Sequence, residues 1–277
     1  MKLGTFQAHI DEMCQQKKIS LEEAADLVHA LGIHAVCVGA DWIGDPAQER
    51  GRLERVGFHI SDVFGSLNFI TEEEVRPAAK RLVERAAALG ADRLLVTTEP
   101  FRDRGNEVVR REDDDRAAQG LCVCCELAAA NGIQVVVEDY DVNDGPFSFG
   151  DDLRYILGQA GRVGFAYDSG NFAFADEDEI ANLERMRGKL AGVVHFKDRS
   201  LQKYRPDEQI RNPLVSLDGV QYYPCPVGSG IIRFEEIKKI LQETGFDGTI
   251  LLEHFNSPDQ YGYLRESAGY VKRLFGM

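Results

Sequence analysis

Long hydrophobic runs are missing from this chain of 277 residues, and no apolar stretch approaches the roughly 20 residues that a membrane span needs. The segment from Met1 to Gln7 lacks the apolar core and cleavage site of a secretory signal. The six cysteines, three of them close together at positions 122, 124 and 125, do not resemble a disulfide framework. We therefore expect a soluble, cytoplasmic protein with reduced thiols.

Positive charge is also scarce. Lysine and arginine number 32 against 46 acidic residues, which gives a formal net charge of −14. An acidic surface repels nucleic-acid backbones and anionic lipid headgroups. We therefore expect a small-molecule partner and no nucleic-acid or membrane partner, while a homo-oligomer remains open.

Short apolar segments and longer amphipathic ones alternate about eight times. The apolar segments are rich in Val, Ile, Leu and Phe and end at Gly or polar residues, as buried parallel strands do. The predicted strands are Leu3–Gln7, His34–Gly39, Phe58–Phe64, Arg93–Thr98, Ile133–Glu138, Val163–Asp168, Gly192–Lys197 and Thr249–Glu253.

Helical patterns follow most of these strands. Capping boxes at Ser20 and Thr71 predict two helix starts, and Gly32 and Gly90 predict the ends of these helices. The later helices are predicted over Asp115–Ala130, Asp151–Gln159, Asp178–Lys189, Phe234–Thr244 and Tyr261–Leu274.

Alternation of this kind predicts a parallel sheet with helical crossovers, and eight units are the size of a closed (β/α)₈ TIM barrel. An open doubly wound sheet would normally carry a glycine-rich loop after its first strand, and the predicted turn Ala8–Asp11 has no glycine. We found no linker, so we expect a single domain over residues 1–277. Two polar stretches, Thr98–Arg111 and Arg199–Gly230, are predicted to be long loops, which are often functional.

Four ionisable side chains end four of the predicted strands: Glu138, Asp168, His195 and Glu253. Because the carboxyl ends of neighbouring parallel strands lie side by side, these groups can converge on one point. Three carboxylates and an imidazole without a thiolate favour Mn²⁺, Mg²⁺ or Co²⁺, and Zn²⁺ also accepts such ligands. The pattern therefore predicts one divalent metal ion.

These fragments resemble the xylose-isomerase-like (β/α)₈ barrel superfamily, in its sugar phosphate isomerase/epimerase branch. The resemblance rests on Val136-Val137-Glu138, Asp168-Ser169-Gly170-Asn171, His195-Phe196-Lys197-Asp198, Gly228-Ser229-Gly230-Ile231-Ile232 and Leu252-Glu253. It implies that the four strand-end residues bind one metal and that Glu138 and Glu253 move a proton next to a sugar carbonyl, through a metal-stabilised enediolate.

Two positions depart from the superfamily pattern. Many relatives have a substrate-binding His where this chain has Asn171, and many have an Asp where it has Arg233. Asn171 therefore becomes a candidate substrate-binding residue. Both departures leave the subfamily open.

Several weaker candidates surround the predicted site. Lys197 lies on the same side of its strand as His195 and could pair with a ligand or contact substrate. His9 and His59 are expected at the ends of strands one and three, on the same rim, as possible substrate contacts.

Trp42 could form the wall of a sugar-binding site, although core packing is its more common role. The arginines at 102, 104, 110 and 111 suit either a phosphate or a solvated loop, and Glu112–Asp115 is expected to flank a helix start.

The leading function from the sequence is a metal-dependent isomerase or epimerase of a sugar, sugar phosphate or cyclitol. The first alternative is a dehydratase of inosose or dehydroshikimate type that uses the same site. The endonuclease branch of the superfamily would need more ligands and a basic face, and six histidines with a charge of −14 argue against it. A non-catalytic sugar-binding protein is the remaining alternative.

Overall fold

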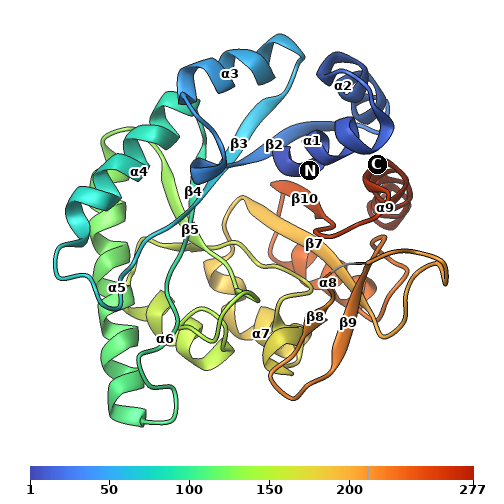
Figure 1. Cartoon of the computed structure of the whole chain (residues 1–277). Coiled ribbons are helices and arrows are strands. Elements are labelled where there is room, and N and C mark those ends of the chain that lie inside the picture. Colours follow the sequence, from blue (N-terminus) through green and yellow to red (C-terminus); the bar gives the residue numbers. More distant parts are fainter. Residues whose placement is uncertain (211) are drawn as a thin grey trace.

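A computed structural model of the chain describes residues 1–210 and 212–277. Ten strands share one sheet, and all except the antiparallel β8 and β9 form a closed parallel ring that helices surround (Figure 1). The ring confirms the predicted TIM barrel. Its strands are β1 (Lys2–Phe6), β2 (Ile33–Gly39), β3 (His59–Ser66), β4 (Arg93–Thr97), β5 (Gln134–Val137), β6 (Gly164–Phe165), β7 (Val193–Ser200) and β10 (Thr249–Glu253).

The ring closes between β6 and β7. Isolated bridges pair Phe165 with Leu190 and Asp168 with His195. The backbone N–H of His195 donates to the Tyr167 carbonyl at 2.8 Å, and the N–H of Ser169 donates back to the His195 carbonyl at 3.0 Å. Asp168 and His195 therefore face each other across the seam of the barrel.

Apolar side chains fill two regions that the strands separate. One cluster lies within the ring and takes residues from several strands, including Phe6, Leu95, Val136 and Leu251. The larger cluster lies between the strands and the helices. Alternating side chains supply both regions, as expected for a barrel whose strands are covered on the outside.

The helices pack around the ring. They are α1 (Gln7–Lys17), α2 (Leu21–His29), α3 (Pro46–Arg55), α4 (Val75–Leu89), α5 (Glu107–Ala129), α6 (Gly150–Gln159), α7 (Glu179–Met186), α8 (Phe234–Glu243) and α9 (Gln260–Phe275), with short 3₁₀ turns η1 (Ala40–Trp42), η2 (Phe172–Ala175) and η3 (Arg187–Lys189). No described helix is long and apolar enough to cross a bilayer.

Helix starts were predicted with mixed success. The capping box at Ser20 is confirmed, because Ser20 Oγ accepts from the Glu23 N–H and Glu23 accepts from the Ser20 N–H. The capping box at Thr71 is wrong: Thr71 Oγ1 accepts from the Asn68 side-chain amide at 2.7 Å in a turn, and α4 begins only at Val75. Local bonding to Asn68 occupies the group that would have capped the helix.

Two helices were missed. The predicted turn Ala8–Asp11 lies inside α1, which begins without a side-chain cap. Helix α3 carries a clear start signal, since Asp45 accepts from the Gln48 N–H and Pro46 occupies the first turn. Its polar sequence buries little besides Leu53, so it lacks the apolar periodicity that marks most helices.

The first predicted loop, Thr98–Arg111, is partly helical, because α5 begins at Glu107 with Asn106 as its cap. Its arginines face carboxylates in what we name the α5–α6 cluster: Arg102, Arg110, Arg111, Asp113, Asp114 and Asp152. Arg102 Nε lies 2.5 Å from Asp113, Arg111 lies 3.2 Å from Asp114, and Arg110 pairs with Asp152. Arg102, Arg104 and Arg111 are nevertheless exposed, as expected for a solvated charged loop, and none of the four predicted arginines lines the pocket described below.

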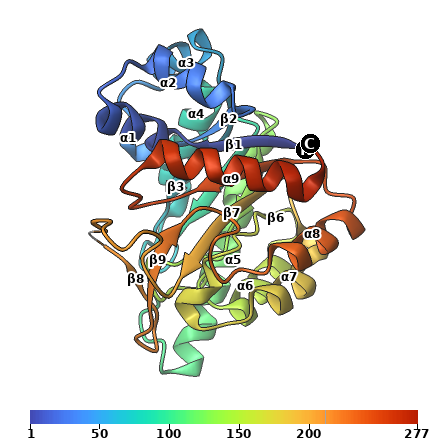
Figure 2. The same ribbon diagram turned by 90° about the vertical axis from the view of Figure 1, so that its right-hand side faces the viewer.

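The second predicted loop, Arg199–Gly230, contains regular structure. Strand β7 continues to Ser200 and pairs with β9 (Gln221–Cys225), which also pairs with the short β8 (Leu214–Val215). In Figure 2, β1 runs from the N-terminus at the right toward the left, and the β8–β9 hairpin lies at that left side. The hairpin thus lies at the end of the barrel where the strands finish.

Candidate metal centre

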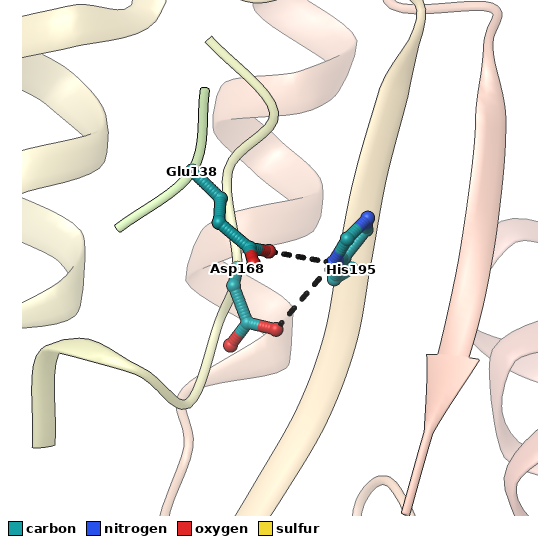
Figure 3. Close-up of side chains that lie close together, drawn as sticks. All are labelled: Glu138, Asp168 and His195. Atoms are coloured by element: carbon teal, nitrogen blue, oxygen red, sulfur yellow. Dashed lines mark ion pairs between the residues drawn. The ribbon is translucent and has the colours of Figure 1, made fainter. Parts of the chain in front are cut away.

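The four strand-end residues predicted as ligands come together at one point. His195 lies within β7, Glu138 follows β5 directly, Asp168 follows β6, and Glu253 is the last residue of β10. Glu138 Oε2 lies 2.9 Å, Glu253 Oε2 3.4 Å and Asp168 Oδ2 3.8 Å from His195 Nδ1. Figure 3 shows Glu138 and Asp168 directed at the same side of the imidazole.

These four residues, named the metal-site cluster from here on, fit a cation. The ligand atoms of Glu138, Asp168 and His195 lie within 4.8 Å of one another, and all three side chains are buried. Glu138 Oε2, Asp168 Oδ2 and both ring nitrogens of His195 have no hydrogen-bond partner in the described part of the chain. Buried polar atoms are normally paired, so unpaired atoms aimed at one point suit a bound ion.

The carboxylates of the metal-site cluster outnumber the positively charged side chains beside them, and their pKa values reflect this. Burial raises the pKa of Asp168 to about 8, although Lys197 opposes the shift. Burial likewise raises the pKa of Glu138, although His195 opposes it. Burial acts in the same direction on Glu253, but Lys197 and His195 outweigh it and hold the pKa of Glu253 below its usual value. Three buried carboxylates thus share the positive charge of one lysine and one imidazole, and a divalent cation would offset the excess.

Two of the predicted substrate-binding residues border this cluster. Lys197 Nζ pairs with Glu253 Oε1, lies 3.7 Å from Asp168 Oδ2, and donates to Asn171 Oδ1 at 2.6 Å. Asn171 Nδ2 in turn donates to the Asp139 carbonyl at 2.6 Å. Lys197 therefore pairs with ligand carboxylates, and Asn171 holds it in place, while both still line the pocket.

The other two predicted substrate-binding residues lie elsewhere. His59 begins β3 instead of ending it, so the expectation that it shares the rim with the ligands is wrong. It is exposed and pairs with Asp92 at the opposite end of the barrel. His9 is fully buried in α1, where its Nε2 accepts from the His254 N–H at 2.9 Å. His9 therefore supports the backbone next to Glu253, and it does not line the pocket.

Sequence reasoning missed three charged residues around the site. Asp139 is buried and accepts from the Asp168 N–H at 3.0 Å, and Arg199 pairs with Asp141 and donates to the Gly170 carbonyl at 3.3 Å. A signal for Arg199 was present, because His195, Lys197 and Arg199 alternate along one strand. It was overlooked because the strand was predicted to end at Lys197.

A pocket of about 790 Å³ opens above the metal-site cluster. Its lining includes Glu138, Glu253 and Lys197 on one side and Trp42 and Phe64 on another. The volume matches the size of small-molecule sites, and such a pocket at the carboxyl end of a barrel is the usual position of an active site.

Two of the sequence fragments that carried the family resemblance are joined in space. Both carboxylate oxygens of Asp198, which follows the His195-Phe196-Lys197 run, accept backbone N–H groups from the Gly228–Ile232 run, including those of Gly228 and Gly230 at 2.9 and 2.8 Å. Arg233, the departure from the pattern, pairs with Glu179 at 2.9 Å at the start of α7. That departure therefore lies away from the predicted ligands.

Comparison with known proteins identifies the family and the fold. Residues 25–274 match the family described as xylose isomerase-like TIM barrel. An inosose dehydratase of Lacticaseibacillus casei is 24% identical over 255 residues, which cover 87% of this chain and 84% of that protein. Among solved structures, the protein IolI with a bound zinc atom has a TM-score of 0.74 at 15% identity, with 100% and 98% of the two chains covered. A D-allulose 3-epimerase from Methylomonas sp. has a TM-score of 0.72 at 12% identity, with 99% and 98% covered.

The family match spans nearly the whole barrel, from α2 to α9, and it includes all four residues of the metal-site cluster. The solved structures share the same fold over nearly their full length. The chain therefore belongs to the xylose isomerase-like TIM barrel family.

Proposed function

We propose that this chain is a divalent-metal-dependent enzyme that removes the proton next to the carbonyl of a cyclitol or sugar, and that the reaction it completes is dehydration. The observation that carries the proposal is the convergence of Glu138, Asp168 and His195, whose unpaired buried atoms face one point beneath a pocket. Burial of charged and polar atoms without partners lowers the stability of the fold unless an ion or ligand binds to them.

The residues of the metal-site cluster would have two roles, metal binding and proton transfer. Glu138, Asp168, His195 and Glu253 would hold the ion, and the oxygen-rich donor set with one imidazole is compatible with Mn²⁺, Mg²⁺, Co²⁺ or Zn²⁺. When bound, the ion supplies Lewis-acid stabilisation of the oxygen that gains negative charge as the proton leaves. Glu138 and Glu253 reach the site from strands that are not neighbours in the ring, so one can remove the proton while the other donates to the leaving hydroxyl group.

Similarity to known enzymes favours dehydration over the isomerisation that the sequence first suggested. The inosose dehydratase of L. casei matches most of this chain, and AsbF from Bacillus anthracis, described as a probable 3-DHS dehydratase, shares the fold with a TM-score of 0.70 at 13% identity. Inosose is a cyclitol ketone, and loss of water from it needs the same proton abstraction as epimerisation. The metal-site cluster would suit both reactions, and the similarity to the inosose dehydratase supports dehydration.

Epimerisation is the second candidate. It needs two groups that exchange a proton on opposite faces of one carbon, and the pair Glu138 and Glu253 provides two carboxylates near the same imidazole nitrogen. The shared fold with the D-allulose 3-epimerase supports this alternative.

The test is a panel of cyclitol ketones and ketoses incubated with the metal-loaded protein, with products separated by mass. Loss of one water molecule identifies a dehydratase, whereas a product of unchanged mass and altered configuration identifies an epimerase or isomerase. Unchanged turnover after exhaustive chelation would contradict the metal-dependent mechanism.

A further inference from the structure

The pocket has two unlike sides. The side formed by β5, β6 and β7 carries charges, with Glu138, Lys197 and Arg199 among the lining residues. The side formed by β1, β2, β3 and the residues after β10 is richer in aromatic rings, with Phe6, Trp42, Phe64 and Phe255 lining it beside Asp41. The ring of Phe6 lies 5.4 Å from that of His195 and 5.2 Å from that of Phe255, so the aromatic side reaches the metal-site cluster without interruption.

Trp42 is held as a flat and open surface on this aromatic side. A β-carbon at Gly39 would lie 2.3 Å from indole Cε3, so the indole can rest on the backbone of β2 only because that residue is glycine. Its ring centroid lies 5.6 Å from that of Phe64 and 6.2 Å from that of Phe255. Even so, 53% of Trp42 is exposed, so the expectation that it packs in the core is wrong.

An indole supported on one face and open on the other, at a pocket mouth, is a stacking platform. Aromatic rings attract the C–H groups of a substrate that presents an apolar face. A six-membered polyol ring with equatorial hydroxyl groups has such a face, because its axial C–H bonds point above and below the ring. An extended open-chain polyol offers no comparable flat face.

The charged side constrains the substrate in a second way. Both lining cations already have partners: Lys197 is bound by Glu253 and Asn171, and Arg199 by Asp141 and the Gly170 carbonyl. A phosphate or carboxylate on the substrate would need a cation that its neighbours have not already neutralised. Among the described lining residues, these two cations are the positively charged ones, and the carboxylates beside them would repel an anion.

We propose that the pocket binds an uncharged polyol in ring form, with the C–H face of the ring stacked on Trp42 and its carbonyl directed toward Glu138 and Glu253. This proposal rests on the proposed function, and it names the substrate class as neutral and cyclic. Trp42 is then a specificity-determining residue, since it selects ring shape over an open chain.

Trp42 also serves as a fluorescence probe of ligand binding, because it is the single tryptophan of the chain. The metal-loaded full chain is titrated with myo-inositol, scyllo-inosose, the open-chain hexitol D-glucitol and myo-inositol 1-phosphate, by tryptophan fluorescence and by calorimetry. We expect a saturable emission change with the two neutral rings, and affinities about tenfold or more lower for the hexitol and the phosphate. Equal or tighter binding of the hexitol or the phosphate, calorimetric binding without an emission change, or no binding of either neutral ring would overturn the proposal.

Substitution of Trp42 separates stacking from general damage. Trp42→Ala should weaken binding of scyllo-inosose by about tenfold, and Trp42→Phe, which keeps a flat ring, should lose less than about threefold. Val108→Ala is the matched control, since Val108 is 68% exposed on α5 and does not line the pocket. An unchanged affinity in Trp42→Ala would contradict stacking. Metal content is measured on the same samples: a wild-type chain that binds the rings but no metal contradicts the proposed function and leaves the stacking proposal standing.

Discussion

Two of the clusters that bury acidic side chains in this molecule balance their charge differently. In the α5–α6 cluster Asp113 and Asp152 each pair with one arginine, Arg102 and Arg110. Asp114 lies 3.2 Å from Arg111, but its oxygens have no hydrogen-bond partner among the described residues. In the metal-site cluster three carboxylates share Lys197 and His195, and several of their polar atoms have no partner among the described residues.

This difference separates structural charges from functional ones. Arginine with one carboxylate makes a self-contained pair that needs no third component. A cluster with more carboxylates than cations is incomplete by itself, and it becomes stable only with a proton or a metal ion. Experiments that remove one charge from each cluster should therefore give different kinds of result.

The largest effect is expected from the metal-site cluster. Asp168→Asn and Glu138→Gln should each lower kcat/KM by on the order of a thousandfold or more, because each removes a predicted ligand of the ion that stabilises the developing charge. Bound metal is counted in the same preparations. Glu112→Gln, which alters an exposed partner of Arg102, is the control. Wild-type activity in either ligand variant would contradict the assignment.

Removal of the ion should next affect stability. Without a cation the carboxylates of the metal-site cluster repel one another, so the free energy of unfolding should fall on chelation. Added metal at about a thousand times its Kd should restore about 4 kcal/mol. Urea unfolding with and without Mn²⁺ measures the change. An Asp168→Asn chain should show little of this response, and a full response in that variant would mean that the ion binds elsewhere.

Breaking a pair in the α5–α6 cluster should destabilise the fold without a direct effect on chemistry. Arg110→Ala removes the partner of Asp152 and a guanidinium that lies 4.9 Å from the Phe149 ring. Asp152 is buried and Arg110 is partly exposed, so loss of the arginine should cost about 2 kcal/mol. Urea unfolding measures the loss, and kcat per folded molecule should stay unchanged. A large loss of kcat in the folded fraction would show that the cluster is not purely structural.

Asp114 should give the smallest effect, and one that depends on pH. Burial and the nearby Asp152 raise the pKa of Asp114 to about 7, although Arg111 opposes the shift. The folded chain therefore holds this proton more tightly than the unfolded chain, and the resulting stability is lost as the pH rises from about 4 to about 7. Asp114→Asn should raise the free energy of unfolding at pH 8 by about 1 kcal/mol. The same pH slope in wild type and variant would refute this, and Asp115→Asn is the neighbouring control.

The grouping of the four candidate ligands could be predicted from the sequence because each one follows a run of apolar residues, although β7 continues past His195. A polar residue at that place stands out against Val, Ile and Leu, and parallel strands bring such residues together without further information. Glu138, Asp168, His195 and Glu253 were therefore grouped correctly in space. Their action on a substrate stays a prediction.

The remaining contacts depend on distances between elements, which a linear pattern does not contain. Arg110 and Asp152 belong to different helices, and their charges look like a solvated loop until α5 and α6 pack together. His59 was misplaced because a strand start and a strand end both border polar residues. Trp42 was expected in the core because nothing in its neighbours along the chain reveals that it rests on Gly39 with one face open.

The seam between β6 and β7 carries one predicted ligand on each edge, since Asp168 and His195 pair across it. A bound ion would therefore link the two strand edges that close the barrel. Amide hydrogens along that seam, such as those of Ala191 and His195, should exchange more slowly with solvent once the ion is bound. A chain that has not closed its sheet has no complete ligand set, so capture of the ion would mark the moment at which assembly of the barrel is finished.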